Sequence, residues 1–348
     1  MTPRQRVEAV LRGERPDRPP FTVYESKIPP EPFASQLARR GMCTVQRRVN
    51  VYDGHHPNCP MTVSEVVVDG RRLRRRDIRT PAGPLHSLEE PAGFTTWTRR
   101  HLFGGPEDYA AMGAYLADMT LEATYAEPAR LEREAPPHVI HRASIGGEPL
   151  QTLISCMGTE TFCVEWMENR DEVLKLYAIV AEKRRLAYRL VASGPLGHAN
   201  YGGNVTPEII GPSIFREYYV PHYQEAAEVL HAGGKKIGVH FDANCRLFSD
   251  DIARLDLDYI EAFTPAPDTD MTLAEARAAW PDKTLWINFP SSVHLQPEPA
   301  VEEAALNLLG EAGAKDGRFI MGITEDLPAG REAGNFAAIL NAIDRYAG

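Results

Sequence analysis

The chain has 348 residues, of which 43% are hydrophobic, 25% charged and 8% aromatic, and its formal net charge is -10. This composition supports a large buried core and excludes a disordered chain. The acidic balance argues against an extended nucleic-acid surface, and the lack of an 18-residue apolar run argues against a membrane span. Because the five cysteines form no CxxC pair and suggest no disulfide framework, we expect a soluble, cytoplasmic protein.

The first predicted elements are a short helix and a strand. Residues 2–11 fit a helix because Thr2 is a favoured N-cap residue and Pro3 is suited to the first helical position. A Pro-rich and Arg-rich segment then ends the helix. The short run 21–24 is the first predicted strand, and it ends at Glu25.

Residues 62–103 differ in pattern from the rest of the chain. Asp69-Gly70 separates two strand-like runs and is a strong signal for a two-residue hairpin turn. Thr80-Pro81-Ala82-Gly83 indicates a further turn, and Phe94 to Arg100 indicates a third strand. We predict an antiparallel β insertion here, within a larger domain.

From residue 105 onward, helical segments alternate with short apolar runs that end in a polar residue. Helices are predicted at 106–116, 120–134, 170–193, 213–232, 273–279, 299–312 and 335–346. Strands are predicted at 138–143, 196–199, 236–240, 259–262, 285–288 and 318–322. This alternation is typical of parallel strands with helical crossovers. The number of units favours a (β/α)8 TIM barrel, and we predict one such domain over 1–348 with the antiparallel β-hairpin insertion in its N-terminal part.

Candidate functional residues stand where predicted strands end, because the chemistry of a TIM barrel is carried by the C-terminal ends of its strands. One imidazole and several carboxyl and amide groups occupy these positions. They are Tyr24-Glu25, Asn200-Tyr201, His240 with Asp242, Glu261, Asn288 and Glu325.

The sharpest pattern is Gly238-Val239-His240-Phe241-Asp242. In a continuing strand, His240 and Asp242 project to the same side and can share one divalent ion. With Glu261 and Glu325 they form a plausible zinc set that leaves a position for substrate. Glu261 and Glu325 are equally compatible with capping loops or pairing with arginines. Asn200, Asn204 and Asn288 are candidate substrate-binding residues, although a Gly-rich turn also explains the first two and a loop leading into a helix also explains Asn288.

Several segments, in their order along the chain, resemble one known family. They are Thr2–Val7 with Leu11–Pro20, Thr80–Gly83, Pro212–Pro221, Val239-His240 and Gly322–Asn335. In that order, they resemble five features of the uroporphyrinogen decarboxylase superfamily. The first pair resembles its opening segment, Thr80–Gly83 its Thr-Pro-x-Gly turn, and Pro212–Pro221 its "SP-x-x-F-x-E-Y-x-x-P" helix. Val239-His240 resembles the start of its His-x-Cys-Gly metal motif, and Gly322–Asn335 its closing region. The similarity is to its corrinoid-dependent methyltransferase branch in particular.

The resemblance implies a methyltransferase. The residues that differ from the family pattern indicate which kind of methyl donor it uses. Thiol methyltransferases of this branch bind zinc through His, Cys and Cys, whereas Asp242 and Glu325 stand here near the two cysteine positions. Carboxylates in place of thiolates favour an oxygen-linked methyl donor, such as a methoxylated aromatic compound. The expected acceptor is the cobalt of a corrinoid (cobalamin), free or on a partner protein, with Tyr201 or Glu25 available to protonate the leaving group.

Two other functions remain open. A decarboxylase acting on a porphyrinogen-like polycarboxylate would need cations in its pocket, so Arg39, Arg40 or Arg47 at the barrel mouth would favour it. A non-catalytic protein that binds a corrinoid or a partner would be favoured if His240, Glu261 and Glu325 were too far apart to share an ion. Neither the methyl donor nor the direction of transfer follows from the sequence.

Overall fold

The computed structural model describes residues 1–47, 49–93 and 95–348. The chain forms two compact units. The barrel unit comprises Met1–Val51, Thr124–Gly146 and Arg189–Gly348, and the insertion unit comprises Tyr52–Ala123 and Gly147–Tyr188. The predicted β insertion at 62–103 lies in the insertion unit.

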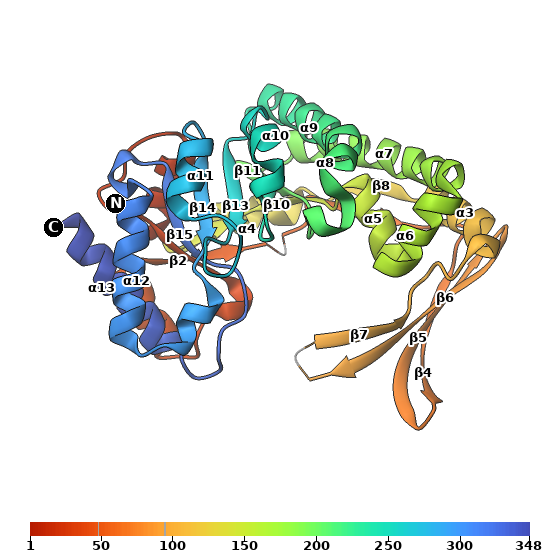
Figure 1. The fold of residues 1–348 in the computed structure, drawn as a ribbon, viewed down its shortest axis with the longest axis horizontal. Helices are drawn as coiled ribbons and strands as arrows, with labels where there is room; N and C mark the ends of the chain where they lie inside the picture. Colours follow the sequence, from red (N-terminus) through yellow and green to blue (C-terminus); the bar gives the residue numbers. More distant parts are fainter. Residues whose placement is uncertain (48, 94) are drawn as a thin grey trace. The chain divides into compact units, whose positions relative to one another are not determined.

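The barrel unit is built on a parallel sheet, as predicted. Within the described residues the strand order is β10-β11-β12-β13-β14-β15-β1-β2-β9. The bounds are β1 Phe21–Tyr24, β2 Met42–Gln46, β9 Val139–His141, β10 Ala143–Gly146, β11 His198–Tyr201, β12 Lys236–His240, β13 Tyr259–Phe263, β14 Thr284–Asn288 and β15 Phe319–Ile323. Figure 1 labels most of these strands.

The sheet closes through residues 139–146. β9 pairs with β2, and β10 pairs with β11, while only Arg142 separates β9 from β10. One extended run of chain therefore bonds to both ends of the sheet. When β9 and β10 are counted as one strand, the described barrel has eight parallel strands, which confirms the predicted (β/α)8 TIM-barrel class.

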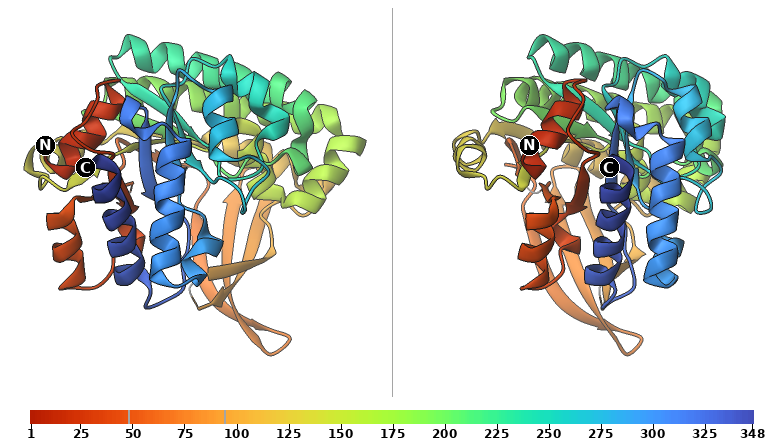
Figure 2. Two further views of the ribbon diagram at one scale, coloured as in Figure 1. Left: turned by 60° about the vertical axis from the view of Figure 1, so that its left-hand side comes forward. Right: turned by 90° about the vertical axis from the view of Figure 1, so that its left-hand side faces the viewer.

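Helices cover the outside of the barrel unit. They are α1 Pro3–Leu11, α2 Phe33–Arg40, α4 Ala126–Glu134, α8 Pro207–Tyr218, α9 Val220–Ala232, α10 Ser249–Ala253, α11 Leu273–Ala279, α12 Glu298–Glu311 and α13 Glu332–Ala347, with the short 3-10 helices η1 Glu25–Lys27, η3 Arg246–Phe248, η4 Ser291–Leu295 and η5 Ala314–Asp316. In Figure 2, α2, α13 and α12 lie side by side, and Arg40 of α2 donates to Asn341 of α13 at 2.8 Å. Thr2 caps α1 in a capping box with Gln5, as the Thr-Pro start predicts.

The insertion unit contains a four-stranded antiparallel sheet. Its strands are β4 Met61–Val68, β5 Arg71–Thr80, β6 Gly83–Ala92 and β7 Thr95–Arg100. Asp69 and Gly70 have φ values of 49° and 75°, which confirms the predicted two-residue turn with positive φ at both positions. The remaining elements of this unit are β3 Tyr52–His55, β8 Thr120–Ala123, η2 Pro106–Asp108, α3 Tyr109–Asp118, α5 Pro149–Met157, α6 Thr159–Glu168 and most of α7 Arg170–Ser193.

Three sequence-based predictions of secondary structure need correction. The strand β6 was not predicted, because its two prolines and adjacent glutamates are poor strand signals that pairing with β5 and β7 overrides. The predicted helix 120–134 begins as β8, since these residues pair with β3, and becomes helical only at Ala126. The predicted helix 213–232 is divided at Tyr219, because Pro221 lacks the amide that would continue the first helix. Phe94, the predicted start of the third strand, lies outside the described residues.

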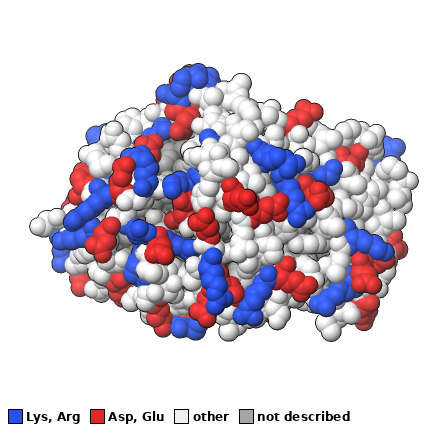
Figure 3. All heavy atoms as spheres, turned by 90° about the horizontal axis from the view of Figure 1, so that it is seen from above, with Lys and Arg blue, Asp and Glu red and all other residues white. Residues whose placement is uncertain are grey.

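Charges of both signs are interspersed on the molecular face drawn in Figure 3. Many of the ion pairs are local, as in Arg130 with Glu127 and Glu134 on α4. None of the described helices combines the length and the apolar character needed to cross a bilayer.

The barrel interior is packed with large side chains. Tyr259 and Trp286 are fully buried, and their polar atoms are satisfied, since Tyr259 donates to the carbonyl of Ala199 at 2.7 Å and Trp286 donates to Thr22 at 2.9 Å. Gly238 of β12 lies against the Tyr259 ring. A β carbon added at this glycine would be 2.0 Å from Cε2 of Tyr259.

We therefore expect Gly238→Ala to destabilise the protein by about 1–3 kcal/mol, because the tightly packed ring of Tyr259 cannot move aside. The free energy of unfolding in urea measures this effect. Gly310→Ala in α12 is the control, since nothing lies within 4 Å of its added β carbon and a helical Gly→Ala change stabilises by about 0.4–1 kcal/mol. Equal stability of the Gly238→Ala variant and the unmodified protein would contradict a rigid ring at this place.

Candidate metal centre and active-site cavity

His240 is the last residue of β12, at the end of the barrel where TIM-barrel chemistry is carried. In the parallel register it stands opposite Glu261 of β13. Its Nε2 lies 3.4 Å from a carboxylate oxygen of Asp242, and its Nδ1 lies 2.7 Å from Oε2 of Glu261. The imidazole therefore has one nitrogen turned to each of two acidic residues.

Three predicted ligands come together at His240. His240, Asp242 and Glu325 each offer one ligand atom, and these atoms all lie within 4.8 Å of one another. Glu325 follows β15, and its backbone is held by Asn288 of β14, whose Oδ1 accepts hydrogen bonds from the amides of Thr324 at 3.0 Å and Glu325 at 3.2 Å. Two neighbouring strands thus bring Glu325 to the residues that follow β12.

The local electrostatics fit a bound cation. Oδ1 of Asp242 is buried and has no hydrogen-bond partner among the described residues. Burial and the nearby Asp242 carboxylate raise the pKa of Glu325 above its ordinary value, since two neighbouring negative charges repel each other. One imidazole nitrogen and two carboxylates are donors that zinc accepts, so the residues present fit this ion.

Glu261 has a different environment from the other three predicted ligands. It is fully buried behind His240 and is not part of the group whose ligand atoms converge. Its carboxylate contacts Tyr24, Arg142, Asn200 and His240. Burial alone would raise the pKa of Glu261, but Arg142 and His240 hold it well below its ordinary value.

The same contacts act on His240 in the opposite direction. Burial lowers the pKa of the imidazole, but the carboxylates of Glu261 and Asp242 outweigh this effect and raise the pKa to about 10. These carboxylates therefore favour the protonated form of His240, and a metal ion that binds Nε2 competes with a proton there.

A cavity of about 280 Å³ lies beside His240. It is lined by Tyr24, Arg47, Arg142, Ala143, Ser144, Asn200, Gly202, Gly203, Asn204 and His240. Polar and charged groups dominate this lining, so the cavity suits a ligand that carries oxygen atoms.

The other predicted site residues are placed unequally around this cavity. Asn200 and Asn204 line it. Glu25 forms an ion pair with Arg47, a residue of the cavity lining. Oε2 of Glu25 lies 3.1 Å from Nε of Arg47. Tyr201 is fully buried against Tyr223 with ring centroids 5.4 Å apart, and the described cavity lining does not include it. Asn288 contacts Thr264 and the Glu325 backbone instead of the cavity.

Sequence reasoning missed the role of Arg142. This side chain is buried between β9 and β10, and its Nη1 lies 2.7 Å from Oε1 of Glu261. Its Nη2 also donates to the hydroxyl of Tyr24 at 3.3 Å. An arginine inside an otherwise buried strand was the available signal, because a charge in such a place requires a buried partner.

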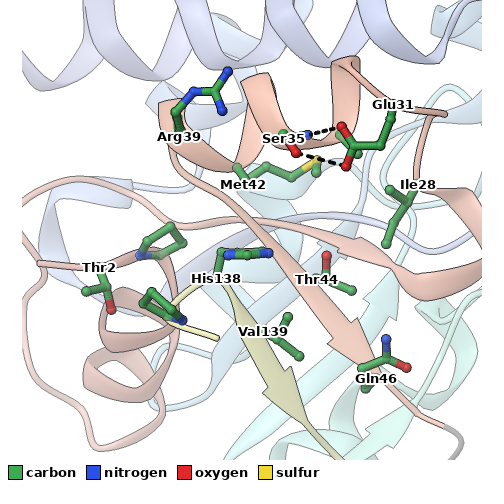
Figure 4. A pocket seen from close by; sticks show the side chains of 14 residues that line it. Thr2, Ile28, Glu31, Ser35, Arg39, Met42, Thr44, Gln46, His138 and Val139 are labelled. Atoms are coloured by element: carbon green, nitrogen blue, oxygen red, sulfur yellow. Dashed lines mark hydrogen bonds between the residues drawn. The ribbon is translucent and has the colours of Figure 1, made fainter. Parts of the chain in front are cut away.

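The three arginines that would favour a decarboxylase lie in three different surroundings. Arg47 lines the cavity and lies over the ring of Tyr24, with Cζ 3.5 Å from the ring centroid. Arg40 pairs with Asp344 of α13. Arg39 lines a separate cavity of about 590 Å³ beside α2 and β2, which Figure 4 shows and whose lining shares no residue with the cavity at His240.

These observations define a TIM-barrel protein with a candidate metal site at the ends of its strands. The family model described as uroporphyrinogen decarboxylase (URO-D) matches residues 116–346, more than half of the chain. The chain therefore belongs to the uroporphyrinogen decarboxylase family.

One similar solved structure is a methyltransferase from Methanosarcina mazei, with 12% sequence identity, a TM-score of 0.63 and 100% coverage of both chains. At this identity the likeness shows the fold. A search of curated proteins found no match.

Proposed function

We propose that the protein is a zinc-dependent methyltransferase that moves a methyl group from a methoxylated aromatic compound to the cobalt of a reduced corrinoid carried by a partner protein. The observation that carries the proposal is the convergence of His240, Asp242 and Glu325 at the strand ends. The cavity beside His240 has room for a small substrate. Family membership and the similar fold of a methyltransferase support the reaction class.

The ligand set supports an oxygen-linked methyl donor. Thiolate ligands are soft, whereas carboxylates are hard and pair with a metal centre that prefers an oxygen ligand. The unpartnered Oδ1 of Asp242 lies in this group of carboxylates. An ether oxygen is therefore a better match for this site than a thiol sulfur.

The reaction breaks the bond between methyl carbon and ether oxygen and forms a carbon–cobalt bond. The methyl group moves as a cation equivalent, so Co(I) becomes formally Co(III), and the oxygen takes up one proton to leave as a phenol. Zinc held by His240, Asp242 and Glu325 would supply stabilisation of the negative charge that develops on the leaving oxygen. The amides of Asn200 and Asn204 are available in the cavity to hold and orient the donor.

The proton source stays a prediction. Of the two predicted acids, Glu25 touches a residue of the cavity lining, Arg47, but as the carboxylate partner of that arginine. Tyr201 is buried outside the lining. Tyr24 does line the cavity, but its hydroxyl donates a hydrogen bond to Glu261 and is thus held within the protein.

A decarboxylase is the second candidate function, because Arg47 and Arg142 line the cavity and are able to attract substrate carboxylates. Each guanidinium already contacts a protein carboxylate, however. Arg47 pairs with Glu25 and Arg142 pairs with Glu261. Since these charges are compensated internally, a polycarboxylate would have to displace existing ion pairs, and the methyltransferase is the better supported function.

Methyl transfer is tested by incubating the protein with cob(I)alamin and a panel of methoxylated aromatic compounds. The absorption spectrum of the corrinoid should change to that of methylcobalamin, at a rate proportional to protein concentration. A parallel panel of methylated thiols serves as the comparison. Methylation from thiols alone would overturn the oxygen-donor assignment, and carbon dioxide release from a porphyrinogen without corrinoid methylation would favour the decarboxylase.

A further inference from the structure

Both carboxylate oxygens of Glu261 are held by protein contacts. Oε1 contacts the hydroxyl of Tyr24 and Nη1 of Arg142, the latter at 2.7 Å. Oε2 accepts from Nδ2 of Asn200 at 3.0 Å and contacts Nδ1 of His240 at 2.7 Å. An ionised carboxylate has about four lone-pair positions. Three of these contacts are hydrogen bonds and the fourth is an ion pair, so both oxygens of Glu261 are engaged by the protein.

The contact with His240 determines which imidazole nitrogen is available. Because a carboxylate only accepts hydrogen bonds, the contact with Oε2 of Glu261 places a proton on Nδ1. Nε2 is then the ring nitrogen that can bind a metal ion. Nε2 faces Asp242, which is part of the group of converging ligand atoms. Glu261 thus orients the ring from the side opposite to the candidate metal position.

The backbone around Glu261 is held in an unusual conformation. The register between β13 and β14 shifts directly after Glu261, so that Ala262 is bulged out of the pairing. Ala262 has φ 58°, a value that non-glycine residues rarely adopt. Strain of this kind persists where the surrounding structure fixes it, and it concentrates at functional sites. The backbone amide of Phe241 also donates to the carbonyl of Glu261 at 2.9 Å, which ties the two strand ends together.

We propose that Glu261 is a positioning residue: it holds the imidazole of His240 so that Nε2 is preset for the metal ion before the ion binds. The inference rests on the proposed function of His240, Asp242 and Glu325 as a zinc site, and it replaces the earlier expectation that Glu261 is itself a ligand. A carboxylate behind a metal-bound histidine typically changes metal affinity by about 10–100-fold.

The chain contains a matched control for this arrangement. Glu132 of α4 contacts Nδ1 of His141 at 2.9 Å and pairs with Arg4, so it repeats the glutamate–histidine–arginine combination. None of these three residues belongs to the converging ligand group. Glu132→Gln therefore reports the effect of losing such a contact where no metal is expected.

The experiment compares Glu261→Gln with Glu132→Gln. Zinc affinity is measured by competition with a chromophoric chelator, and the ligand geometry is read from the visible absorption of the Co²⁺-substituted protein. We expect Glu261→Gln to bind zinc about 10–100-fold more weakly and to have an altered Co²⁺ spectrum. Glu132→Gln should match the unmodified protein in both measurements.

Two outcomes separate this inference from the proposed function. A folded Glu261→Gln variant with unchanged affinity and spectrum overturns the positioning role and leaves the zinc site standing. An unmodified protein that binds neither zinc nor Co²⁺ overturns the metal site itself. If Glu261→Gln does not fold, ¹⁵N NMR of the zinc-loaded unmodified protein tests the positioning role. We expect Nδ1 of His240 to keep its proton. Zinc coordination through Nδ1 would refute the inference.

Discussion

Replacing His240 by alanine is expected to abolish stoichiometric zinc binding and to lower the rate of corrinoid methylation by about 100-fold or more. His240 supplies the nitrogen ligand of the converging group, and the two remaining carboxylates would be left without it. Stabilisation of the leaving oxygen by a metal ion contributes several kcal/mol to the transition state, and each 1.36 kcal/mol corresponds to a factor of ten in rate. Metal content is measured by elemental analysis of the purified variant, and the rate by the corrinoid spectrum.

The control for His240→Ala is His231→Ala. His231 also contacts aspartates, with Nε2 2.8 Å from Asp258 and Nδ1 3.2 Å from Asp256, but it is not part of the converging group. The His231→Ala variant should keep its bound zinc and its methyltransferase activity. Glu325→Ala should lose metal as His240→Ala does. Stoichiometric zinc that survives both the His240→Ala and Glu325→Ala changes would exclude this group as the metal site.

Replacing Arg142 by methionine is expected to lower the free energy of unfolding by about 3–5 kcal/mol. The change leaves the fully buried carboxylate of Glu261 without the guanidinium that lies 2.7 Å from it, and an uncompensated buried charge carries a penalty of this size. His240 still contacts Glu261 at 2.7 Å, so we expect a value toward the lower end of this range. Urea unfolding followed by circular dichroism measures the effect.

Arg130→Met is the matched control for Arg142→Met. Arg130 also pairs with glutamates, but its side chain is 46% exposed, and an exposed pair of this type contributes at most about 1 kcal/mol. The two variants should therefore differ by at least about 2 kcal/mol. If they are equally stable, the Arg142–Glu261 pair is accessible to water in solution and does not support a rigid site.

The two effects are connected through one cluster of side chains. Arg142 compensates Glu261, and Glu261 contacts Nδ1 of His240. A change at Arg142 is thus expected to reach the metal affinity as well as the stability. Measuring zinc affinity in Arg142→Met extends the test of the positioning role to a residue that does not contact the ligand group.

Local sequence signals predicted much of the barrel because they act over a few residues. The Thr2 cap, the Asp69-Gly70 turn and the strand at Lys236–His240 were each recognised from adjacent residues. The rule that parallel strands end at the same side of a barrel then brought residues of distant segments together. It grouped His240, Asp242, Glu261 and Glu325, and the ligand atoms of all but Glu261 do converge.

The amino-acid sequence by itself determined the class of fold, the strand ends and the types of side chain that they present. Only the tertiary structure decided what each side chain contacts. It converted part of a predicted helix into β8, added β6 to the antiparallel sheet and placed Tyr201 in the core. It also surrounded Glu261 with Tyr24, Arg142 and Asn200, which are 237, 119 and 61 residues away along the chain. Such contacts depend on strand register and burial, which residue spacing does not encode, because a carboxylate becomes a metal ligand or a buried ion-pair partner according to the groups that fold around it.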